Sequence, residues 1–253
     1  MPRRAAVLVC AALVAAAPGG ARGDTLASLE AEQTALFERV APSVAVLSAG
    51  SAIGAGFAVA PGLLLTAAHV VEGTRFVDVL LRDGRTLRGE VVERGAGGLD
   101  VALVRVPSAP PPLDLAPSAA LRPGSVVATV GHPDGNRFTL GIGLVAQAPG
   151  VGPDASLVRL QLPLRPGASG GPVVDRSGRV VGVVALGAPG TVAFAVRLEA
   201  AVRSLAGLSG VSLAPAPPLV AAPPPADAVP LSSHGGAPVA RAAPAQAPER
   251  PTP

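Results

Sequence analysis

The chain has 253 residues, a formal net charge of +3 at pH 7 and only 2% aromatic residues. All 20 basic residues are arginines, and once those at positions 3, 4 and 22 are set aside, 17 arginines balance 17 acidic residues. A nearly neutral chain without a basic cluster or stacking rings offers no phosphate-binding face, which excludes nucleic acid as its main partner.

Residues 1–23 have the pattern of a secretory signal peptide. Two arginines near the start precede an unbroken apolar stretch at 5–17, and small residues follow up to Gly23. The apolar stretch is too short to cross a bilayer core of about 30 Å, so we expect export, cleavage and no stable membrane insertion afterwards. Cleavage after Ala21 and cleavage after Gly23 both fit. The only cysteine, Cys10, lies in this segment, so the mature protein would have no disulfide.

The region 24–208 has the patterns of one folded domain that begins with a short helix. Asp24 and Thr25 can cap this helix, and apolar residues recur at helical spacing until Pro42. Short runs rich in valine and leucine then alternate with turn sequences, which favours an all-β barrel or sandwich with a terminal helix at 198–205. The expected strands are 44–47, 56–60, 63–66, 76–81, 86–92, 101–106, 126–130, 158–162, 173–174, 180–185 and 192–196.

Residues 209–253 form a tail rich in proline and alanine. From Leu213 onward, 12 of 41 residues are proline, and no apolar periodicity remains. This composition predicts a disordered or extended spacer.

Three motifs place a histidine, an aspartate and a serine in that order along the chain. His69 follows an apolar run, Asp100 precedes another, and Ser169 lies in a Gly-Ala-Ser-Gly-Gly-Pro sequence. A serine hydroxyl is a poor nucleophile at neutral pH, so it needs an imidazole to accept its proton and a carboxylate to hold that imidazole in the right tautomer. Each residue taken singly has a structural explanation. The combination and its order predict a serine protease, as in chymotrypsin-like double β-barrels.

The glycines around Ser169 have separate expected roles. The backbone N–H groups of Gly167 and Ser169, aimed at one point by a tight turn, can stabilise the oxyanion of a tetrahedral intermediate. Gly170 and Gly171 would let the chain pass close behind the nucleophile, and Pro172 would begin the next strand.

Two other classes of protein share part of this pattern. Residues 167–171 satisfy the Gly-x-Ser-x-Gly elbow of α/β-hydrolases, but that elbow needs a following helix and a later histidine. A strand is expected here instead, and the only later histidine is His234, in the tail. A protease-like domain kept as a non-catalytic binding module in the cell envelope is the remaining alternative.

Neither a cofactor nor a metal is expected. His132 and Asp134 could form a metal pair, but the folded region has no further histidine except His69, so a turn role fits them better. The Gly-x-Gly pairs at 54–56 and 141–143 lack a third glycine and a following helix, so dinucleotide binding has no support.

Several stretches together carry a family resemblance, and they are 54–57, 65–71, 99–103, 131–133, 141–145, 166–172 and 193–196. Through them the chain, from Val40 to Val196, resembles the protease domain of the HtrA (Do-like, trypsin-like) serine proteases. The resemblance implies a chymotrypsin-like fold of two β-barrels with the active site between them. It also implies protein or peptide substrates in the periplasm or outside a bacterial cell.

The chain departs from the HtrA pattern at points that bear on its control. Family members usually carry PDZ domains where only the proline-rich tail follows here, and they often have asparagine where this chain has Ala168. Phe37 is the only aromatic candidate near the start of the domain for contacts between subunits, so the sequence does not support an oligomer.

The resemblance also indicates where a substrate pocket would lie. Pro163 stands six positions before the serine, where digestive relatives carry a charged residue that selects basic side chains, so an arginine-binding pocket is not expected. If residues 191–196 form a pocket wall, Val192, Ala193 and Phe194 would favour small or medium aliphatic side chains.

Overall fold

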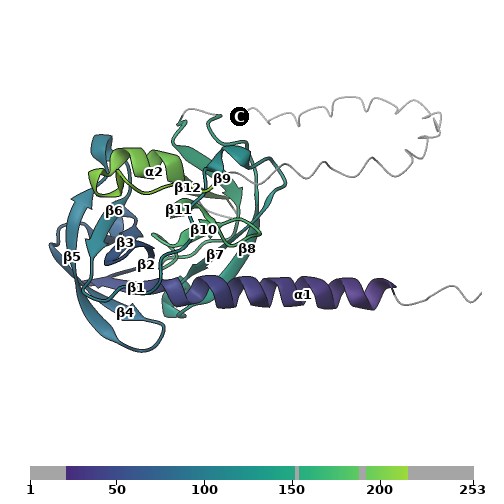
Figure 1. The fold of residues 1–253 in the computed structure, drawn as a ribbon, viewed down its shortest axis with the longest axis horizontal. Helices are drawn as coiled ribbons and strands as arrows, with labels where there is room; N and C mark the ends of the chain where they lie inside the picture. The colour runs from purple at the N-terminus through teal and green to yellow at the C-terminus, as the bar shows by residue number, and fades with distance from the viewer. Residues whose placement is uncertain (1–20, 152–153, 188–191, 216–253) are drawn as a thin grey trace, which may run out of the picture. The chain divides into compact units, whose positions relative to one another are not determined.

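Twelve strands of the described chain form two closed antiparallel barrels, which confirms the predicted fold class (Figure 1). The computed structural model describes residues 21–151, 154–187 and 192–215, all of which belong to one compact unit. Residues 1–20, which hold most of the expected signal, and the tail from residue 216 lie outside the described residues.

The first barrel joins its strands in the order β1-β2-β3-β6-β5-β4. Along β4, buried and exposed side chains alternate, because successive residues of a strand point to opposite faces and one face lines the barrel. Leu47, Leu64 and Val79 belong to the apolar cluster of this interior. The strands are β1 (Val44–Ala49), β2 (Ala52–Ala60), β3 (Leu63–Thr66), β4 (Phe76–Leu81), β5 (Thr86–Arg94) and β6 (Ala102–Arg105).

The second barrel joins its strands in the order β10-β11-β12-β9-β8-β7. Its interior is a separate apolar cluster that includes Leu160, Leu162 and Val184. The strands are β7 (Val126–Gly131), β8 (Thr139–Val145), β9 (Leu157–Gln161), β10 (Pro172–Val174), β11 (Val180–Gly187) and β12 (Val192–Arg197).

Strand β8 is absent from the strands that the apolar runs predict, although the family resemblance includes its sequence. Gly141 and Gly143 lower its strand propensity, which is why the local pattern fails. The packing explains both glycines. A Cβ on Gly143 would lie 2.4 Å from the carbonyl oxygen of Gln161, and one on Gly141 would lie 3.1 Å from Cγ2 of Thr129.

Glycines turn the chain at three predicted hairpin tips. Gly62, Gly84 and Gly178 have φ angles of +77°, +90° and +82°, and this left-handed region costs glycine little because it has no Cβ. Each glycine connects two strands that are paired in one barrel, so these turns are confirmed.

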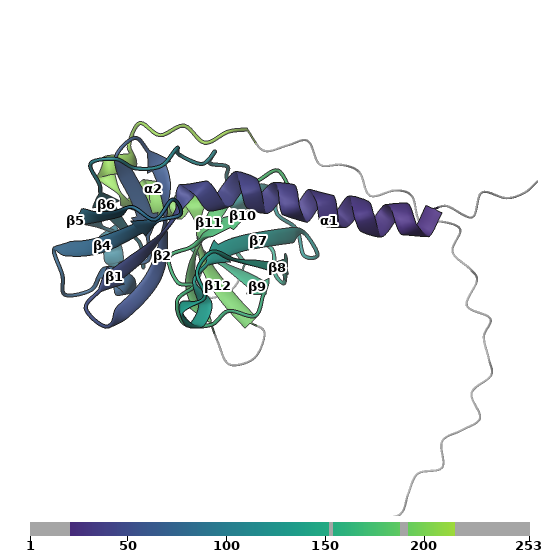
Figure 2. The same cartoon turned by 90° about the horizontal axis from the view of Figure 1, so that it is seen from below.

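Helix α1 (Ala21–Val40) precedes the first barrel and runs past β7 on the outside of the second (Figures 1 and 2). The predicted cap at Asp24 and Thr25 is wrong, because the helix has already begun at Ala21. Alanine and arginine at positions 21 and 22 are good helix formers, so they extend the helix before this polar pair. No helix in the described part of the chain combines the length and apolar character needed to cross a membrane.

Polar contacts anchor the second half of α1. Arg39 Nη1 donates to the backbone carbonyl of Ser177 at 2.7 Å, between β10 and β11. Glu38 pairs with Arg82 of the first barrel at 3.1 Å. The helix therefore contacts both barrels.

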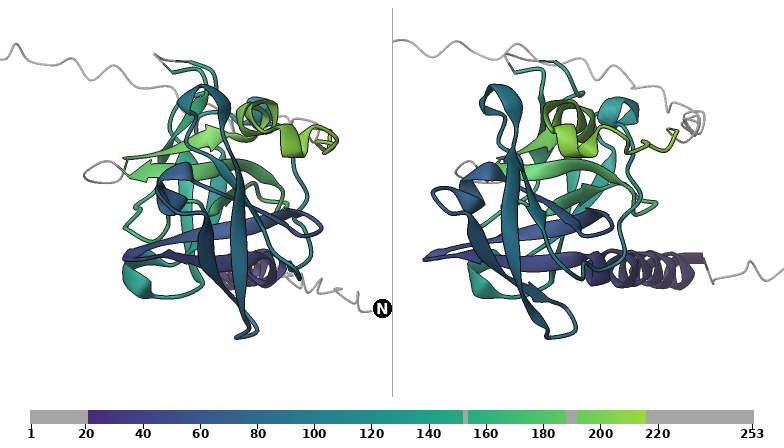
Figure 3. Two further views of the ribbon diagram at one scale, coloured as in Figure 1. Left: turned by 90° about the vertical axis from the view of Figure 1, so that its left-hand side faces the viewer. Right: turned by 60° about the vertical axis from the view of Figure 1, so that its left-hand side comes forward.

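Helix α2 (Leu198–Ser204) confirms the predicted terminal helix and packs at the junction of the two barrels. Leu198 and Ala201 join a buried apolar cluster with Leu103 of the first barrel and Val183 of the second. Figures 1 and 3 show α2 on the side of the barrels away from α1. Six 3₁₀ helices complete the described elements: η1 (Ala41–Ser43), η2 (Ala68–Val71), η3 (Ala96–Gly98), η4 (Ser118–Ala120), η5 (Pro133–Gly135) and η6 (Ala206–Leu208).

The segment after α2 is also fixed by hydrogen bonds. The carboxylate of Glu93 accepts the backbone N–H groups of Ala206 and Gly207 at 2.6 and 2.8 Å. Further on, the N–H of Ala214 donates to the carbonyl of Leu115 at 2.7 Å. Hydrogen-bonded structure thus continues past residue 208.

Candidate active site

His69 and Asp100 lie at one edge of the first barrel because their strands are neighbours. β3 ends at Thr66, and η2 carries His69 shortly after it. β6 pairs with β3 so that Ala102 lies opposite Thr66, and Asp100 precedes Ala102 by two residues. Antiparallel pairing therefore brings together two side chains that are 31 residues apart.

Two hydrogen bonds join His69 to Asp100. The ring atom Nδ1 lies 2.8 Å from Oδ2, and the backbone N–H of His69 donates to Oδ1 at 3.0 Å. Because an ionised carboxylate only accepts, Nδ1 carries the ring proton and Nε2 keeps its lone pair when the ring is neutral. The side chains of His69 and Asp100 are 42% and 28% exposed, so the carboxylate lies at the barrel edge and is only partly buried.

The contact between His69 and Asp100 shifts the pKa of both side chains. The hydrogen bond to Asp100 raises the pKa of His69 above 6.5, against the effect of burial, and the charges of Asp100 and Glu72 act in the same direction. Partial burial opposes ionisation of Asp100, yet hydrogen bonds from His69 and Ala68 hold the pKa of this carboxyl below its usual value. Asp100 is therefore ionised at neutral pH.

Ser169 is carried by the second barrel and pressed against the first. Its carbonyl accepts the N–H of Ala55 in β2 at 2.7 Å. A Cβ on Gly170 would lie 2.2 Å from the carbonyl oxygen of Ala55 and 2.3 Å from Oγ1 of Thr66, which confirms the close approach predicted for this glycine. The structure thus brings the backbone of Ser169 and Gly170 to the end of β3, three residues before His69.

Thr66 has a role at this junction that sequence reasoning missed. Its hydroxyl is fully buried and donates to the carbonyl of Ala55 at 2.7 Å. A hydroxyl at the end of an otherwise apolar strand was the available signal, since a buried polar group needs a partner.

The turn before Ser169 leaves two backbone donors free. Gly167 has a φ of +98°, and the N–H of Ala168 closes the turn on the carbonyl of Arg165 at 3.1 Å. Among the described residues, the N–H groups of Gly167 and Ser169 have no hydrogen-bond acceptor. The hydroxyl of Ser169 and Nε2 of His69 also have no hydrogen-bond partner among the described residues, so no direct hydrogen bond joins them.

A cavity of about 380 Å³ borders Asp100. Residues of both barrels line it, and Phe194 is the one expected pocket residue among them. Val192 lies on a separate hollow, and Pro163 is exposed after β9. Ala193 is fully buried within the second barrel, because it points to the opposite face of β12 from Val192 and Phe194. Thr191 lies outside the described residues. The other lining residues are Gly98, Leu99, Asp154, Ser156, Leu157, Ala185 and Val196.

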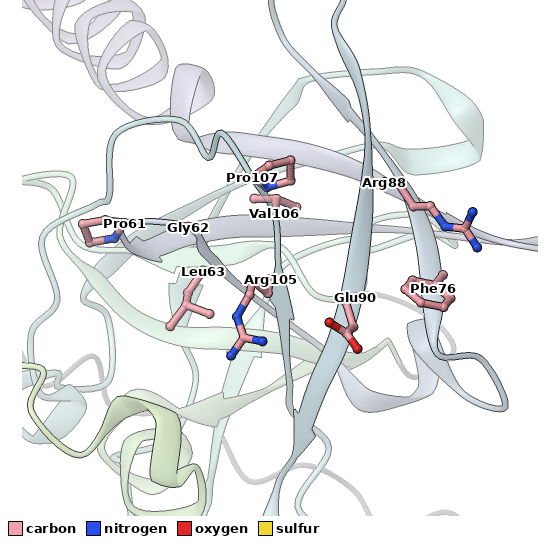
Figure 4. A pocket seen from close by; sticks show the side chains of 9 residues that line it. All are labelled: Pro61, Gly62, Leu63, Phe76, Arg88, Glu90, Arg105, Val106 and Pro107. Carbon is pink, nitrogen blue, oxygen red and sulfur yellow. The ribbon is translucent and has the colours of Figure 1, made fainter.

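A larger hollow, of about 610 Å³, lies on the outer face of the first barrel (Figure 4). Two of its three charged side chains, Arg88 and Glu90, have partners on the same surface. Glu90 accepts two hydrogen bonds from Arg75, and the guanidinium of Arg88 lies 4.3 Å from the ring centre of Phe76. None of His69, Asp100 and Ser169 lines it.

His132 and Asp134 take the turn role expected of them. η5 follows His132 directly, and Asp134 has a φ of +51°. Both ring nitrogens of His132 are hydrogen-bonded, to the carbonyl of Ala45 at 3.1 Å and to the N–H of Phe138 at 3.0 Å. Its ring therefore has no lone pair to give a metal. Within the residues that the structure describes, no group of three His, Cys, Asp or Glu side chains could hold one.

Comparisons with known proteins agree with this arrangement. The family profile described as "Trypsin-like peptidase domain" matches residues 54–183. The chain is 38% identical over 163 residues to the serine protease HhoA of Synechocystis, a match that covers 58% of this chain and 41% of that protein. It is 33% identical over 136 residues to a DegP-like periplasmic serine endoprotease of Halomonas elongata, over 52% of this chain and 28% of that protein.

A solved structure shares the fold. The crystal structure of the Rv3671c protease in its inactive form matches with a TM-score of 0.60 and 27% identity, and covers 68% of this chain and 92% of that chain. The sequence of the Mycobacterium tuberculosis serine protease Rv3671c is 32% identical over 141 residues, which is 52% of this chain and 35% of that protein. The matched part spans 28% to 41% of the length of the curated relatives named here.

The junction at Gly170 makes a prediction for stability. Gly170→Ala places a Cβ against Ala55 and Thr66 in a backbone with a φ of +80°, so we expect the free energy of unfolding to fall by about 3 kcal/mol or more. Gly210→Ala is the matched control, because its Cβ would meet nothing within 4 Å, and its effect should stay within about 0.5 kcal/mol. Urea unfolding measures both. Equal losses in the two variants would contradict this account of the junction.

Proposed function

We propose, for a chain that belongs to the trypsin-like peptidase domain family, that it is a serine endopeptidase acting on proteins or peptides through an acyl-enzyme formed on Ser169. The observation that carries the proposal is the double hydrogen bond between His69 and Asp100 at the barrel edge against which the backbone of Ser169 and Gly170 packs. The family, the order of the three residues and the relatives named as serine proteases support the same activity.

In the proposed reaction, the three side chains divide the chemistry. The hydroxyl oxygen of Ser169 attacks the peptide carbonyl carbon while Nε2 of His69 accepts its proton as general base. The same imidazole then gives the proton to the leaving amine, and water repeats the sequence to release the acid from the serine ester. Asp100 keeps the ring proton on Nδ1 and stabilises the imidazolium that forms between these steps.

The backbone N–H groups of Gly167 and Ser169 are the proposed oxyanion donors. Their support is that neither donates to an acceptor within the described residues, so both remain free for a ligand. The charge on the carbonyl oxygen grows as the tetrahedral intermediate forms, and donors held in place beforehand stabilise it without reorganisation.

The cavity beside Asp100 is the proposed place for a substrate side chain. Phe194, Leu157, Ala185 and Val196 give it an apolar wall, which favours aliphatic side chains. Of the expected pocket residues, this proposal retains Phe194 and omits Ala193, because Ala193 lies inside the barrel.

We further propose that the protein is exported and acts in the periplasm or outside a bacterial cell, with residues 1–23 as the signal peptide. The pattern of those residues and the periplasmic location in the name of the Halomonas relative support this. The proposed folded domain is 24–208 together with the hydrogen-bonded segment up to Ala214, and the proposed spacer is the rest of the expected tail 209–253.

The catalytic assignment predicts the effect of three substitutions. Ser169→Ala, His69→Ala and Asp100→Ala should each lower turnover by about 10⁴-fold or more with little change in unfolding. Fluorophosphonate labelling and casein hydrolysis by the purified protein measure this, and Ser209→Ala, a change of an exposed serine, should keep full activity. If the wild type shows no labelling that depends on Ser169, the non-catalytic binding module becomes the better explanation.

The shifted pKa of His69 predicts the pH dependence of activity. The general base must be neutral, so kcat/KM should fall as the pH drops through a pKa above 6.5. Asp100→Asn removes the negative charge that raises this pKa, so the acid limb should move to lower pH while kcat falls by about 10⁴-fold. A pH profile of kcat/KM for both proteins tests this, and an unmoved acid limb would argue against the His69–Asp100 pairing.

The apolar wall predicts the side chains that are cleaved best. A peptide library should show a preference for small or medium aliphatic side chains, and Phe194→Ala should shift it toward larger ones because the cavity widens. A dominant preference for arginine or lysine would overturn this part of the proposal.

A further inference from the structure

His132 is a fully buried imidazole at the contact between the two barrels. It follows the end of β7 in the second barrel, and its side chain reaches the carbonyl of Ala45 in β1 of the first. Ala45 and His132 are 87 residues apart in sequence. The ring of Phe138 packs edge-on against the imidazole, with ring centres 5.0 Å apart.

The two hydrogen bonds of the His132 ring fix its tautomer. The carbonyl of Ala45 can only accept, so Nε2 carries the proton. The backbone N–H of Phe138 can only donate, so Nδ1 must keep its lone pair. Only the neutral Nε2–H form satisfies both partners. A protonated ring would set two donors, Nδ1–H and the N–H of Phe138, against each other.

The loop that His132 begins holds the turn before Ser169. The backbone N–H of His132 donates to the carbonyl of Gly167 at 3.1 Å, and that of Asp134 donates to the carbonyl of Pro166 at 2.8 Å. Asp134 also forms an ion pair with Arg165. These contacts fix the carbonyls of Pro166 and Gly167, while the N–H groups of Gly167 and Ser169 have no acceptor among the described residues.

The same loop is under backbone strain. Asp134 and Phe138 are the two non-glycine residues with positive φ in the described ranges, at +51° and +55°. Such backbone persists only where its surroundings hold it. For Phe138, the partner of its N–H is the ring of His132, so loss of that ring removes the hydrogen bond that holds the strained end of the loop.

We propose that His132 is a positioning residue for catalysis, whose neutral imidazole ties loop 132–138 to the first barrel and so holds the turn at 165–169 in the shape that presents the amides of Gly167 and Ser169 to the oxyanion. This role rests on the proposed function. Nothing in it requires His132 to touch the substrate.

The surroundings of the ring keep it neutral. Burial lowers the pKa of His132, the bond to Ala45 opposes this, and the charge of Arg137 lowers it further. The other charged residues of loop 132–138 and of the turn are Asp134 and Arg165, which pair with each other. β1 presents none, because its residues 44–49 are uncharged. His69 therefore gains its proton at higher pH than His132 does.

Substitution with a matched control tests the role. His132→Phe keeps an aromatic ring and removes both hydrogen bonds, so the maximal rate of fluorophosphonate labelling at saturating probe should fall by about 10²-fold. The half-saturating concentration should change by less than about threefold, because the loss lies in the reacting state rather than in binding. The side chain of His132→Gln can still donate to Ala45, so this variant should be labelled at least about tenfold faster than His132→Phe.

Val145→Ala is the control for lost stability. It truncates a buried side chain of β8 in the core of the same barrel, and the rate per folded molecule should stay at the wild-type value. A folded His132→Phe protein that labels at the wild-type rate overturns the proposal, and so does a glutamine variant no faster than the phenylalanine one.

A spectroscopic measurement decides the matter if His132→Phe does not fold. In the full-length His69→Ala, His234→Ala double variant, His132 is the only histidine left of three. Its ¹⁵N ring shifts at neutral pH should report the Nε2–H tautomer, and the amide shift of Gly167 should follow protonation of this ring. An Nδ1–H tautomer, or a Gly167 amide that ignores the ring, overturns the proposal.

The two proposals fail in different ways. If the wild type shows no Ser169-dependent labelling, the proposed function fails, while the tautomer and the Gly167 response can still be measured. If the wild type labels normally and the substitutions at His132 do not change its rate, only the role of His132 fails.

Discussion

The hydrogen bond from the N–H of Ala55 to the carbonyl of Ser169, 2.7 Å long, joins the two barrels where the chemistry is proposed. Each barrel closes its own sheet and fills its own interior. The geometry of the site is not fixed by either closure alone, because His69 and Asp100 belong to the first barrel and Ser169 to the second. Their relation depends on how closely one backbone can approach the other, which is why a residue without Cβ is required at position 170.

Two further features hold the barrels at that distance. An apolar cluster unites Leu103, Val183 and residues of α2 at the junction. Burial of its surface drives the barrels together but is non-directional, so it does not fix their relative position. Directional hydrogen bonds fix that relative position. His132 crosses from the second barrel to Ala45 of the first. Within the first barrel, Thr66 donates to Ala55 and fixes the backbone against which Ser169 and Gly170 lie. Such buried polar bonds are costly to break, because each would leave an unpaired group away from water.

The two histidines of the described chain illustrate opposite uses of one side chain. His69 is half-exposed beside a carboxylate, and its pKa is raised. His132 is fully buried, with a backbone carbonyl and a backbone N–H as partners, and its pKa is lowered. Environment rather than residue type makes the first suitable for accepting and returning a proton and the second suitable for holding a loop.

The resemblance to the HtrA serine proteases is confirmed at the level of the protease domain, by the trypsin-like family profile and by relatives such as HhoA and the DegP-like endoprotease. The strand runs and hairpin glycines were readable because side chains alternate along a strand and turns need particular residues. The local pattern did not predict strand β8, because its residues Gly141 and Gly143 are required by close contacts with neighbouring strands. Ala193 was expected in the pocket but lies inside the second barrel. The face to which a strand side chain points depends on how the strand is placed in its barrel.

By itself, the sequence determined the fold class, the family and the identities of the three residues proposed for catalysis, because strand runs, turns and short motifs are all local patterns of residues. Only the tertiary structure decided that Asp100 stays at the barrel edge, that His132 connects the two barrels, and that the cavity beside Asp100 is lined by Phe194 but not by Val192. The physical reason is distance along the chain. Contacts between residues 87 positions apart, such as Ala45 and His132, arise when two barrels pack, and no local pattern of residues encodes that packing.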